Sequence, residues 1–311
     1  MSPSDWPQVA VIGAGAVGCY FGGMLTRAGA PVTFAGRPGK PSAHIDALAR
    51  EGLRFDSVNF QEQVKVRVAA LDAAVRAADL ILLCVKTLDT ESAAKQIAPH
   101  LKPGATVVSL QNGVDNAERI RAAAGFEALS SVVYVAASLP GAGHLRHAGR
   151  GDLILGHPKR TAEVQRLAEM FTHAGVPCRV SENLEGDLWV KLTMNCAGNA
   201  ISALARTTYG RIVAHEPAMQ VVMNVIAEAV AVARAAGIAL PPTDLTAAGL
   251  KLLAGDLKNA TSSTAQDIAA GRRTEIASLN GFIAARGAAL GVPTPVNHTL
   301  FAMVKLLEEN P

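Results

Sequence analysis

The segment Val9-Ala-Val-Ile-Gly-Ala-Gly-Ala-Val-Gly18 decides the fold. Four apolar residues, typical of a short buried strand, lead directly into a Gly-x-Gly-x-x-Gly pattern, and a stretch with helical periodicity follows as far as Arg27. A second run rich in β-branched residues, Val32–Ala35, comes after the turn at Gly29. Strand, helix and strand within about 30 residues form one βαβ unit. The sequence therefore predicts a parallel sheet near the start of the chain.

Short apolar runs and helical segments keep alternating as far as residue 182, which favours a doubly wound parallel sheet. The further predicted strands are 64–68, 80–85, 106–110, 131–136, 153–155 and 177–180, and the predicted helices are 89–98, 116–124 and 162–174. His144 and His147 are expected in a glycine-rich loop ahead of the strand at 153.

After residue 182 the short apolar runs stop, and apolar residues recur every three or four positions, the period of a helix. The predicted helices are 216–236, 243–254, 272–290 and 298–308. The first of them has an expected buried face made of Met219, Val222, Met223, Ile226 and Val230. We therefore expect an α/β chain of two domains: a Rossmann-type doubly wound sheet over 1–182 and an all-helical domain over 183–311.

The composition excludes several classes of protein. Half of the 311 residues are hydrophobic and 18% are charged, which rules out a disordered chain. The formal net charge is +3 without a basic stripe, so we expect no nucleic-acid partner. The densest apolar run, Leu80–Val85, is far shorter than the roughly 20 residues that span a membrane.

Neither the start of the chain nor its cysteines indicate secretion. Residues 1–7 lack the basic and apolar regions of a secretory signal. The four cysteines form no Cys-x-x-Cys pair, and the eight histidines include no His-x-x-x-His pair. We therefore expect a cytoplasmic protein with reduced cysteines and no metal site.

The glycine loop has the spacing of a dinucleotide site. Gly13 permits the tight turn, Gly15 the close approach of a pyrophosphate, and Gly18 the close packing of helix on strand. The residues expected to contact the cofactor are Gly13, Ala14, Gly15, Ala16, Val17 and Gly18. A NAD site usually ends its second strand with an acidic residue, whereas here Gly36 and Arg37 favour the 2′-phosphate of NADP(H). The alternative is that Arg37 is a solvated turn residue.

Polar residues stand directly after two other predicted strands. Lys86 follows the strand at 80–85, and Gln111-Asn112-Gly113 follows the strand at 106–110. Doubly wound sheets bind ligands at the carboxyl ends of their strands, so Lys86 and Asn112 are candidate site residues. A polar residue after a strand is also common without any ligand.

A polar stripe runs along the segment 189–202. Lys191, Asn195 and Asn199 share one face at 100° per residue. An ammonium beside two carboxamides suits a small ligand rich in oxygen, because Asn both donates and accepts hydrogen bonds. A solvated helix face is the alternative. Further along, Ser263 with Gln266 fits a helix capping box.

This ordered set of motifs resembles the ketopantoate reductase (2-dehydropantoate 2-reductase) family over nearly the entire chain. The motifs are GAGAVG at 13–18, Lys86, QNG at 111–113, WxKLxxNxxxN at 189–199, and SSxxQD, RTEI and NGF within 262–282. The resemblance implies a Rossmann-type NADP domain joined to a helical domain, with the site in the cleft. It also implies NADPH-dependent reduction of 2-dehydropantoate to (R)-pantoate in pantothenate biosynthesis.

The resemblance assigns roles to individual residues. It implies that Lys191 is the general acid and that Glu275 is a second catalytic residue, which lines the site near cofactor and substrate. Substrate contacts are implied for Asn112, Asn195, Asn199 and Ser263, and cofactor contacts for Arg37, Lys86, Asn112 and Ala137. Family members often carry Asn three residues before the matched serine, where this chain has Ala260.

Two alternatives stay open. One is a reductase of a different 2-keto acid, which Ala260 favours. The other is a non-catalytic NADP-binding regulatory protein, although such a protein has no need of a proton donor such as Lys191. The expected partner is a small 2-keto acid, with no nucleic acid and no membrane, and the candidate oligomer is a homodimer.

Overall fold

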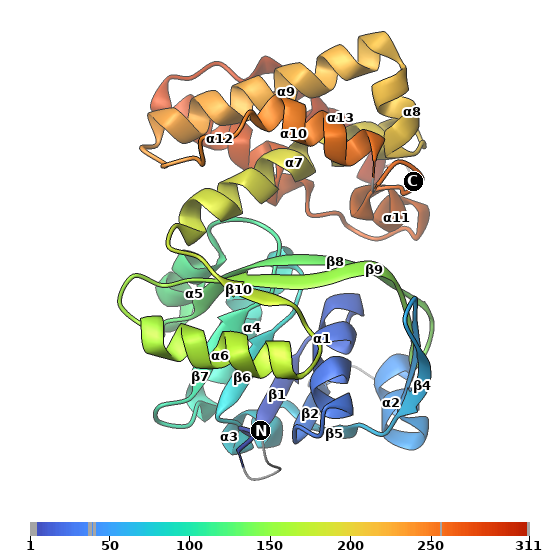
Figure 1. The fold of residues 1–311 in the computed structure, drawn as a ribbon, viewed down its shortest axis with the longest axis vertical. Coiled ribbons are helices and arrows are strands. Elements are labelled where there is room, and N and C mark those ends of the chain that lie inside the picture. The colour runs from blue at the N-terminus through green and yellow to red at the C-terminus, as the bar shows by residue number, and fades with distance from the viewer. Residues whose placement is uncertain (1–4, 37–38, 40–41, 256, 310–311) are drawn as a thin grey trace. The chain divides into compact units, whose positions relative to one another are not determined.

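The computed structural model describes residues 5–36, 39, 42–255 and 257–309. The chain divides into two compact units, Met1–Leu184 and Glu185–Pro311, two residues beyond the expected boundary after residue 182. The first unit is a sheet covered by helices, and the second is built from helices (Figure 1). Arg37 lies outside the described residues.

Six neighbouring strands of the ten-stranded sheet run parallel. They are β1 (Val9–Ile12), β2 (Val32–Gly36), β5 (Arg67–Ala70), β6 (Leu80–Leu83), β7 (Thr106–Ser109) and β8 (Leu129–Gly141). Their order across the sheet is β5-β2-β1-β6-β7-β8, so the direction of winding reverses between β1 and β6 (Figure 1). The expected doubly wound sheet is confirmed, and its switch point is where such folds bind ligands.

Helices cover both faces of the parallel strands. They are α1 (Ala16–Arg27), α2 (Ala43–Glu51), α3 (Leu71–Ala77), α4 (Thr90–Ile97), α5 (Asn116–Ala124) and α6 (Thr161–His173), with the short 3-10 helices η1 (Thr87–Asp89) and η2 (Ala98–His100). Alternate residues of β1 enter two separate cores, because strand side chains alternate between faces. Val11 lies in one cluster with Phe21 of α1 and Phe171 of α6, whereas Ile12 lies in another with Val75 of α3. Burial on both faces explains why β1 is wholly apolar.

The other strands extend the sheet beyond β8, and all but the outermost of them, β4 (Gln61–Val64), run opposite to β8. They are β9 (His144–Leu155), antiparallel to β8, then β3 (Leu53–Ser57), β4 and β10 (Cys178–Val180). His144 and His147 therefore lie in a strand, and the expected glycine-rich loop is wrong. The glycines accompany register shifts in the β8–β9 ladder, with φ of +149° at Gly149 and +126° at Gly151. Bulged strands favour glycine at such positions.

The expected single strand at 64–68 is in fact the ends of two strands. β4 ends at Val64 and pairs with β3, whereas β5 begins at Arg67 and pairs with β2. Apolar alternation continues through the break, as Val64-Lys-Val-Arg-Val68. Alternation reports which side chains are buried, and it carries no signal for a change of partner strand.

The second unit is helical throughout its regular elements. These are α7 (Leu184–Leu204), α8 (Tyr209–Ala214), α9 (Glu216–Ala235), α10 (Leu245–Ala254), α11 (Ser263–Ala269), η3 (Ile276–Ser278), α12 (Asn280–Leu290) and α13 (Pro295–Glu309). The Glu228 carboxylate of α9 accepts hydrogen bonds from the backbone N–H groups of Val296 and Asn297, each at 2.9 Å. The buried Asn297 side chain donates to the same carboxylate at 2.7 Å. A carboxylate placed there satisfies N–H groups that have no partner within the helix.

The predicted helix over 272–290 begins late. Thr274 donates its backbone N–H to Oε1 of Glu308 on α13 at 2.8 Å, and regular α-helix starts only at Asn280. The stretch before it contains only the short turn η3. A tertiary contact from a distant helix thus overrides the helical periodicity of the sequence.

The buried face of α9 is rotated from the expected one. Val222 and Ile226 are buried as expected, whereas Met219, Met223 and Val230 are only half-buried. The other buried residues are Val225, Ala229, Val232 and Ala233. Within the described helices, α9 alone has the length and hydropathy to cross a membrane. Core helices of globular domains pass the same test, and α9 packs against α8, α10, α12 and α13.

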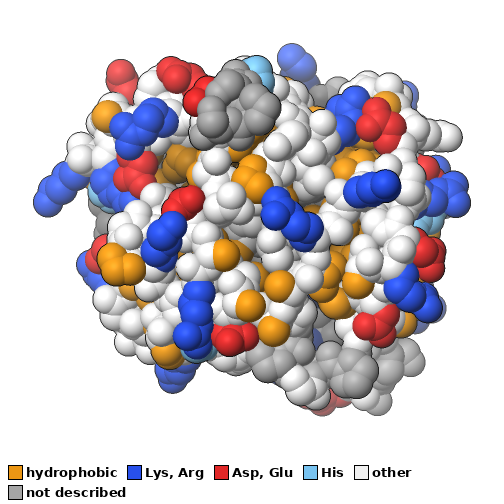
Figure 2. Space-filling model, turned by 90° about the horizontal axis from the view of Figure 1, so that it is seen from below, with side chains coloured by type: hydrophobic (Ala, Val, Ile, Leu, Met, Phe, Trp, Pro, Cys, Tyr) orange, Lys and Arg blue, Asp and Glu red, His pale blue; other side chains and the backbone are white. Residues whose placement is uncertain are grey.

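Surface charges of both signs are mixed. On the face shown in Figure 2, Lys and Arg side chains are interspersed with Asp and Glu side chains. Ion pairs join opposite charges in the first unit, such as Arg27 with Glu62 at 2.8 Å. The face in Figure 2 therefore lacks the continuous cationic stripe typical of nucleic-acid-binding surfaces.

The substitution Gly18→Ala should destabilise the first unit. A Cβ at this position would lie 2.1 Å from the Gly13 carbonyl oxygen and 3.0 Å from Cγ1 of Val11. Overpacking costs roughly 1–3 kcal/mol, and we expect a loss of this size in the free energy of unfolding from denaturant titration. Gly15→Ala is the matched control, because no neighbour lies within 4 Å of its Cβ. Equal losses in the two variants would contradict this account.

Candidate active site

The glycine loop joins β1 to α1 at the switch point of the sheet. Gly13 has φ of +100°, and a Cβ on it would lie 2.7 Å from the Val85 nitrogen. Gly15 is exposed, has open space where a Cβ would lie, and caps α1 without any side-chain hydrogen bond. The first N–H groups of α1 have no partner within the helix, and no acidic residue stands in the first turn, so this end of α1 has the chemistry that suits an anion.

The end of β6 lies against this loop. The Cys84 nitrogen donates to the Ile12 carbonyl at 2.7 Å, so the pairing of β1 with β6 continues to the start of the glycine loop. Lys86 follows two residues later, half-buried, immediately before η1. The structure thus places Lys86 at the carboxyl edge of β6, beside the strand that carries the glycines.

Asn112 is held through its backbone by a buried polar network. Its carbonyl oxygen accepts from the Thr87 hydroxyl at 2.8 Å and from the Asn116 side chain at 2.7 Å. Next to it, Gln111 is buried and donates to the Val85 carbonyl at 3.1 Å and to the Thr90 hydroxyl at 2.8 Å. These bonds join the ends of β6 and β7, so the position of Asn112 is fixed relative to Lys86.

A cavity of about 720 Å³ opens at the carboxyl ends of β2 and β5. Its lining residues are Gly36, Ile45, Val68, Ala69, Ala70, Leu71, Asp72, Gln96 and His100. Gly36 is the last residue of β2, so the cavity lies where the ribose end of a dinucleotide is expected in this fold.

Ala137 lies on β8, where it is opposite His147 of β9. It is half-buried and packs on the same hydrophobic cluster as Ala14, Ala16 and Val17 of the glycine loop and α1. The β8–β9 hairpin and the glycine loop therefore pack against the same hydrophobic cluster of the first unit.

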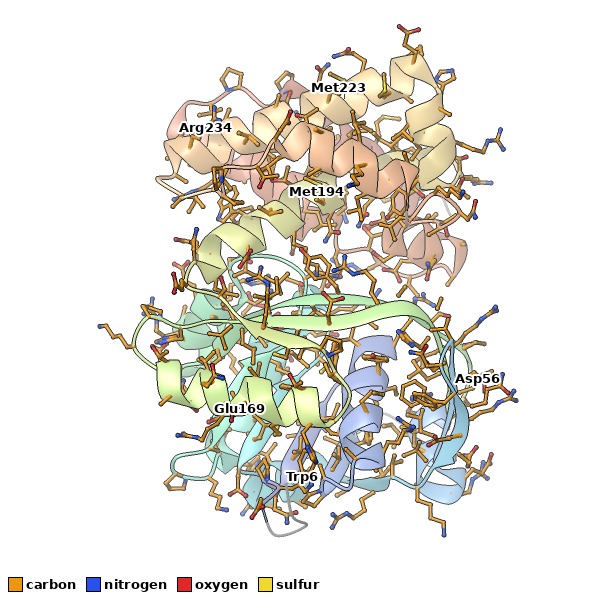
Figure 3. All side chains as sticks on the ribbon, viewed as in Figure 1. Trp6, Asp56, Glu169, Met194, Met223 and Arg234 are labelled. Atoms are coloured by element: carbon orange, nitrogen blue, oxygen red, sulfur yellow. The ribbon has the colours of Figure 1, made fainter. Side chains whose placement is uncertain are left out.

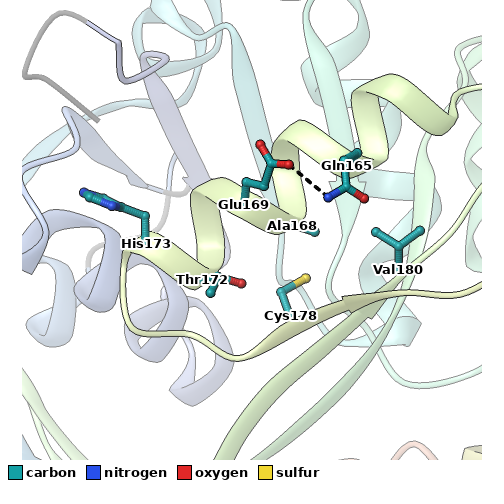
Figure 4. Close-up of a pocket in the computed structure, with 7 residues that line it drawn as sticks. All are labelled: Gln165, Ala168, Glu169, Thr172, His173, Cys178 and Val180. Carbon is teal, nitrogen blue, oxygen red and sulfur yellow. Dashed lines mark hydrogen bonds between the residues drawn. The ribbon is translucent and has the colours of Figure 1, made fainter.

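A second cavity, of about 450 Å³, lies between α6 and β10 (Figure 4). Gln165 donates to Glu169 at 2.9 Å on its helical side, and Cys178 lines the strand side. Burial raises the pKa of the Cys178 thiol to about 12, so this sulfur is a weak nucleophile at neutral pH. No described residue among the predicted site residues lines this cavity.

In the second unit, α7 carries Lys191, Asn195 and Asn199 at successive turns. Lys191 and Asn195 are half-buried, and Asn199 is only 5% exposed, so the stripe is not a fully solvated face. Other α7 side chains pack inward, among them Met194, whose Sδ would lie 3.1 Å from a Cβ on Gly249 of α10 (Figure 3).

Asn199 is the centre of a buried hydrogen-bond network. Its side-chain oxygen accepts from the Tyr209 hydroxyl at 2.9 Å, and its backbone carbonyl accepts from the Ser262 hydroxyl at 3.0 Å. The Ser262 N–H donates to the Ser202 hydroxyl at 3.1 Å. These bonds fasten the start of α11 to α7 and therefore place Ser263 next to the polar stripe.

The expected capping box at Ser263 is wrong by one residue. Ser262 is the N-cap of α11, and its hydroxyl accepts from the Ala265 N–H at 2.9 Å. Ser263 is the first helical residue and is exposed. Its hydroxyl is therefore not needed to cap the helix, which leaves it for a ligand.

Glu275 is half-buried and lies directly before η3. The next residue, Ile276, is fully buried in a cluster with Ala200 of α7 and Val304 of α13. Thr274, on the other side, is held by Glu308. The Glu275 backbone is thus fixed between two anchored neighbours, one of which packs beside Asn199.

Sequence reasoning missed the residues that hold the site residues in place. Tyr209, Ser262 and Gln111 are buried, and each bonds to a residue of the site or to a neighbour of one. One signal pointed to Tyr209. Gly198 lies within a long helix, and an isolated glycine there indicates close approach of another group: a Cβ on Gly198 would lie 2.6 Å from Cε1 of Tyr209.

Comparison with known proteins decides the family. The family model "Ketopantoate reductase PanE/ApbA" matches residues 9–160, and its C-terminal counterpart matches residues 183–308. This chain belongs to the ketopantoate reductase family. The family assignment from the motifs is confirmed, and the chain is an NADP-dependent oxidoreductase, as ketopantoate reductases are.

Relatives match over the whole length of the chain. The 2-dehydropantoate 2-reductases of Halobacterium salinarum and Pyrococcus abyssi are 32% and 30% identical, covering 97% and 96% of this chain and 99% and 97% of theirs. A crystal structure of a PanE/ApbA family ketopantoate reductase from Ralstonia eutropha is 47% identical with a TM-score of 0.89, covering 97% of this chain and 98% of that one. D-mandelate dehydrogenase, at 24% identity and TM-score 0.89, shares the fold.

The two adjacent serines provide a matched test of the site's construction. Ser262→Ala removes the cap of α11 and its bond to α7, so we expect a loss of about 1–3 kcal/mol in the free energy of unfolding. Ser263→Ala removes an exposed hydroxyl and should change this free energy by less than about 0.5 kcal/mol. Denaturant titration of both variants measures the difference. A larger loss for Ser263→Ala would show that the wrong serine has been named as the cap.

Proposed function

We propose that this chain reduces 2-dehydropantoate to (R)-pantoate with NADPH, with Lys191 as the general acid. One observation carries the proposal: Lys191, Asn195 and Asn199 form a stripe on α7 whose inner end is buried and hydrogen-bonded. The match of the relatives over the whole chain supports the substrate. We further propose that the enzyme is cytoplasmic and a homodimer.

The first unit fits the cofactor. The open space at Gly15 and the start of α1, whose cap makes no side-chain hydrogen bond, suit the pyrophosphate, and the cavity beside Gly36 suits the adenosine end. We propose that Ala14, Ala16 and Val17 contact the cofactor beside the glycines, with Lys86, Asn112 and Ala137. Arg37 is the proposed partner of the 2′-phosphate. It follows Gly36 directly in the sequence, at the position where a NAD site usually carries an acidic residue.

The second unit fits a 2-keto acid. NADPH, when bound, supplies the hydride that adds to the keto carbon. The keto oxygen gains negative charge as this happens, and the Lys191 ammonium stabilises the charge and donates the proton. Asn195 and Asn199 bind the hydroxyl at the acyl end, and Ser263 binds the carboxylate. Asn112 and Glu275 line the site beside the reacting groups.

A reductase of a different 2-keto acid is the second candidate. Ala260 favours it, because the side chain at this position offers no hydrogen bond and the backbone is already engaged. The Ala260 carbonyl accepts from the Tyr209 N–H at 3.0 Å, and its N–H donates to the Leu257 carbonyl at 2.9 Å. A pocket with one polar partner fewer discriminates less between acyl groups.

A panel of 2-keto acids, each assayed with NADPH and with NADH, tests the proposed function. We expect the highest kcat/KM for 2-dehydropantoate with NADPH, ahead of 2-ketoisovalerate, which lacks the hydroxymethyl group. NADPH oxidation is followed by absorbance. A higher kcat/KM for 2-ketoisovalerate would favour the second candidate, and no turnover of any keto acid would favour a non-catalytic NADP-binding protein.

The variant Lys191→Ala tests the general acid. Loss of a positioned proton donor typically lowers the rate by about 10²–10⁴-fold, so we expect kcat to fall by that factor while the Kd of NADPH, measured by fluorescence titration, is unchanged. Lys251→Ala, which removes an exposed lysine on α10, is the matched control and should keep full kcat. The proposed role is wrong if Lys191→Ala retains near-full kcat at neutral pH.

A further inference from the structure

The carboxamide of Asn199 is held by one phenol. The Tyr209 hydroxyl donates to Asn199 Oδ1 at 2.9 Å, and both side chains are buried, 7% and 5% exposed. The neighbouring Ser262 hydroxyl donates its one proton to the Asn199 backbone carbonyl and accepts from the Ala265 N–H. The phenol proton is therefore the donor that satisfies Asn199 Oδ1.

The position of the Tyr209 ring is fixed by its packing against α7 and by backbone hydrogen bonds. A Cβ on Gly198 would lie 2.6 Å from its Cε1 atom, so the ring lies directly on the backbone of α7. Its backbone N–H donates to the Ala260 carbonyl at 3.0 Å, and the next N–H, of Gly210, donates to Lys258 at 2.9 Å. Burial raises the pKa of Tyr209 above its ordinary value, so the hydroxyl stays protonated across the working pH range.

With Oδ1 occupied, the free end of the Asn199 amide is its NH2 group. Within the described residues, no hydrogen bond is made by Asn199 Nδ2, although the other polar atoms of Asn199 are engaged on Tyr209 and Ser262. A flipped amide would direct a carbonyl oxygen to the ligand side and place an NH2 group, in place of the acceptor Oδ1, against the phenol hydroxyl. The contact with Tyr209 therefore selects one of the two amide orientations.

We propose that Tyr209 is a specificity-determining positioning residue, which locks Asn199 so that it presents N–H donors to an oxygen acceptor on the acyl end of the substrate. This inference rests on the proposed function, because the ligand oxygen in question is the hydroxyl of 2-dehydropantoate. Tyr209 itself acts through Asn199. Because Ala260 offers no side-chain hydrogen bond, the Tyr209–Asn199 contact contributes a larger share of the discrimination between 2-keto acids with and without the hydroxyl.

The variant Tyr209→Phe keeps the ring and removes only the hydroxyl. Loss of one hydrogen bond corresponds to a factor of about 5–10. We expect kcat/KM for 2-dehydropantoate to fall by that factor because KM rises, while kcat is unchanged. Both kcat and KM for 2-ketoisovalerate should also be unchanged. Tyr134→Phe, a tyrosine of β8 in the other unit, is the matched control and should leave both substrates unaffected. Thermal unfolding of each variant reports whether the fold persists.

A double-mutant cycle shows whether Tyr209 acts through Asn199. The double variant Tyr209→Phe, Asn199→Ala should have the same ratio of kcat/KM for the two keto acids as Asn199→Ala alone, because the positioned amide is already absent. The proposal is overturned if the reductions in kcat/KM caused by the two substitutions multiply in the double variant. It is also overturned if Tyr209→Phe lowers kcat/KM equally for both keto acids. Wild-type enzyme that reduces the two keto acids equally well overturns the proposed substrate instead.

A spectroscopic readout tests the lock without any substrate. In 1H–15N spectra, the side-chain NH2 signals of Asn199 are identified by their loss in Asn199→Ala. We expect one sharp pair in the wild-type protein and a shifted, broadened pair in Tyr209→Phe, since the amide gains a second orientation. Unchanged signals in Tyr209→Phe overturn the locking role, whatever the substrate is.

Discussion

The close approach of α1 to β1 and β6 is the constraint on which the first unit depends. It is possible only because Gly13 and Gly18 have no side chains: a Cβ on either would lie within 2.7 Å of backbone atoms. This approach brings the start of α1 to the carboxyl edge of the sheet and the Lys86 turn beside it. The geometry that we propose for phosphate binding is thus a consequence of helix–strand packing, and of the three glycines of the motif Gly15 is the one with open space where a Cβ would lie.

The second unit is organised around α7, through polar contacts as well as apolar ones. Asn199 connects α7 with the starts of α8 and α11, because it bonds to Tyr209 and to Ser262. Ile276 packs on the adjacent Ala200. Asn195 and Asn199, two of the residues proposed to bind substrate, are therefore presented by a helix to which Tyr209, Ser262 and Ile276 are anchored. Precise recognition requires rigid support of this type.

Much of the fold and of the candidate site could be predicted from the sequence, because short motifs carry the information. The spacing of Gly13, Gly15 and Gly18 within one βαβ unit suffices to assign their roles, although Gly13 also packs against Cys84 and Val85 at the end of β6. The β8–β9 hairpin was missed because its bulges place glycines in a strand, where they imitate a loop. Tyr209 and Ser262 were missed because their importance arises from tertiary contacts with α7, and periodicity carries no record of such contacts. Arg37 was singled out by its position after β2, and it lies outside the described residues.

The Glu308 contact has a consequence for the order in which the molecule matures. Thr274, the neighbour of Glu275, is held by a carboxylate 34 positions further along the chain. During synthesis the strands and the glycine loop emerge long before this carboxylate does, and domains generally fold as units in the order in which they leave the ribosome. A nascent chain can therefore complete the nucleotide half while the Glu275 segment still lacks its anchor. Cofactor binding should be acquired early in biosynthesis, and catalytic competence only once α13 has been made and docked.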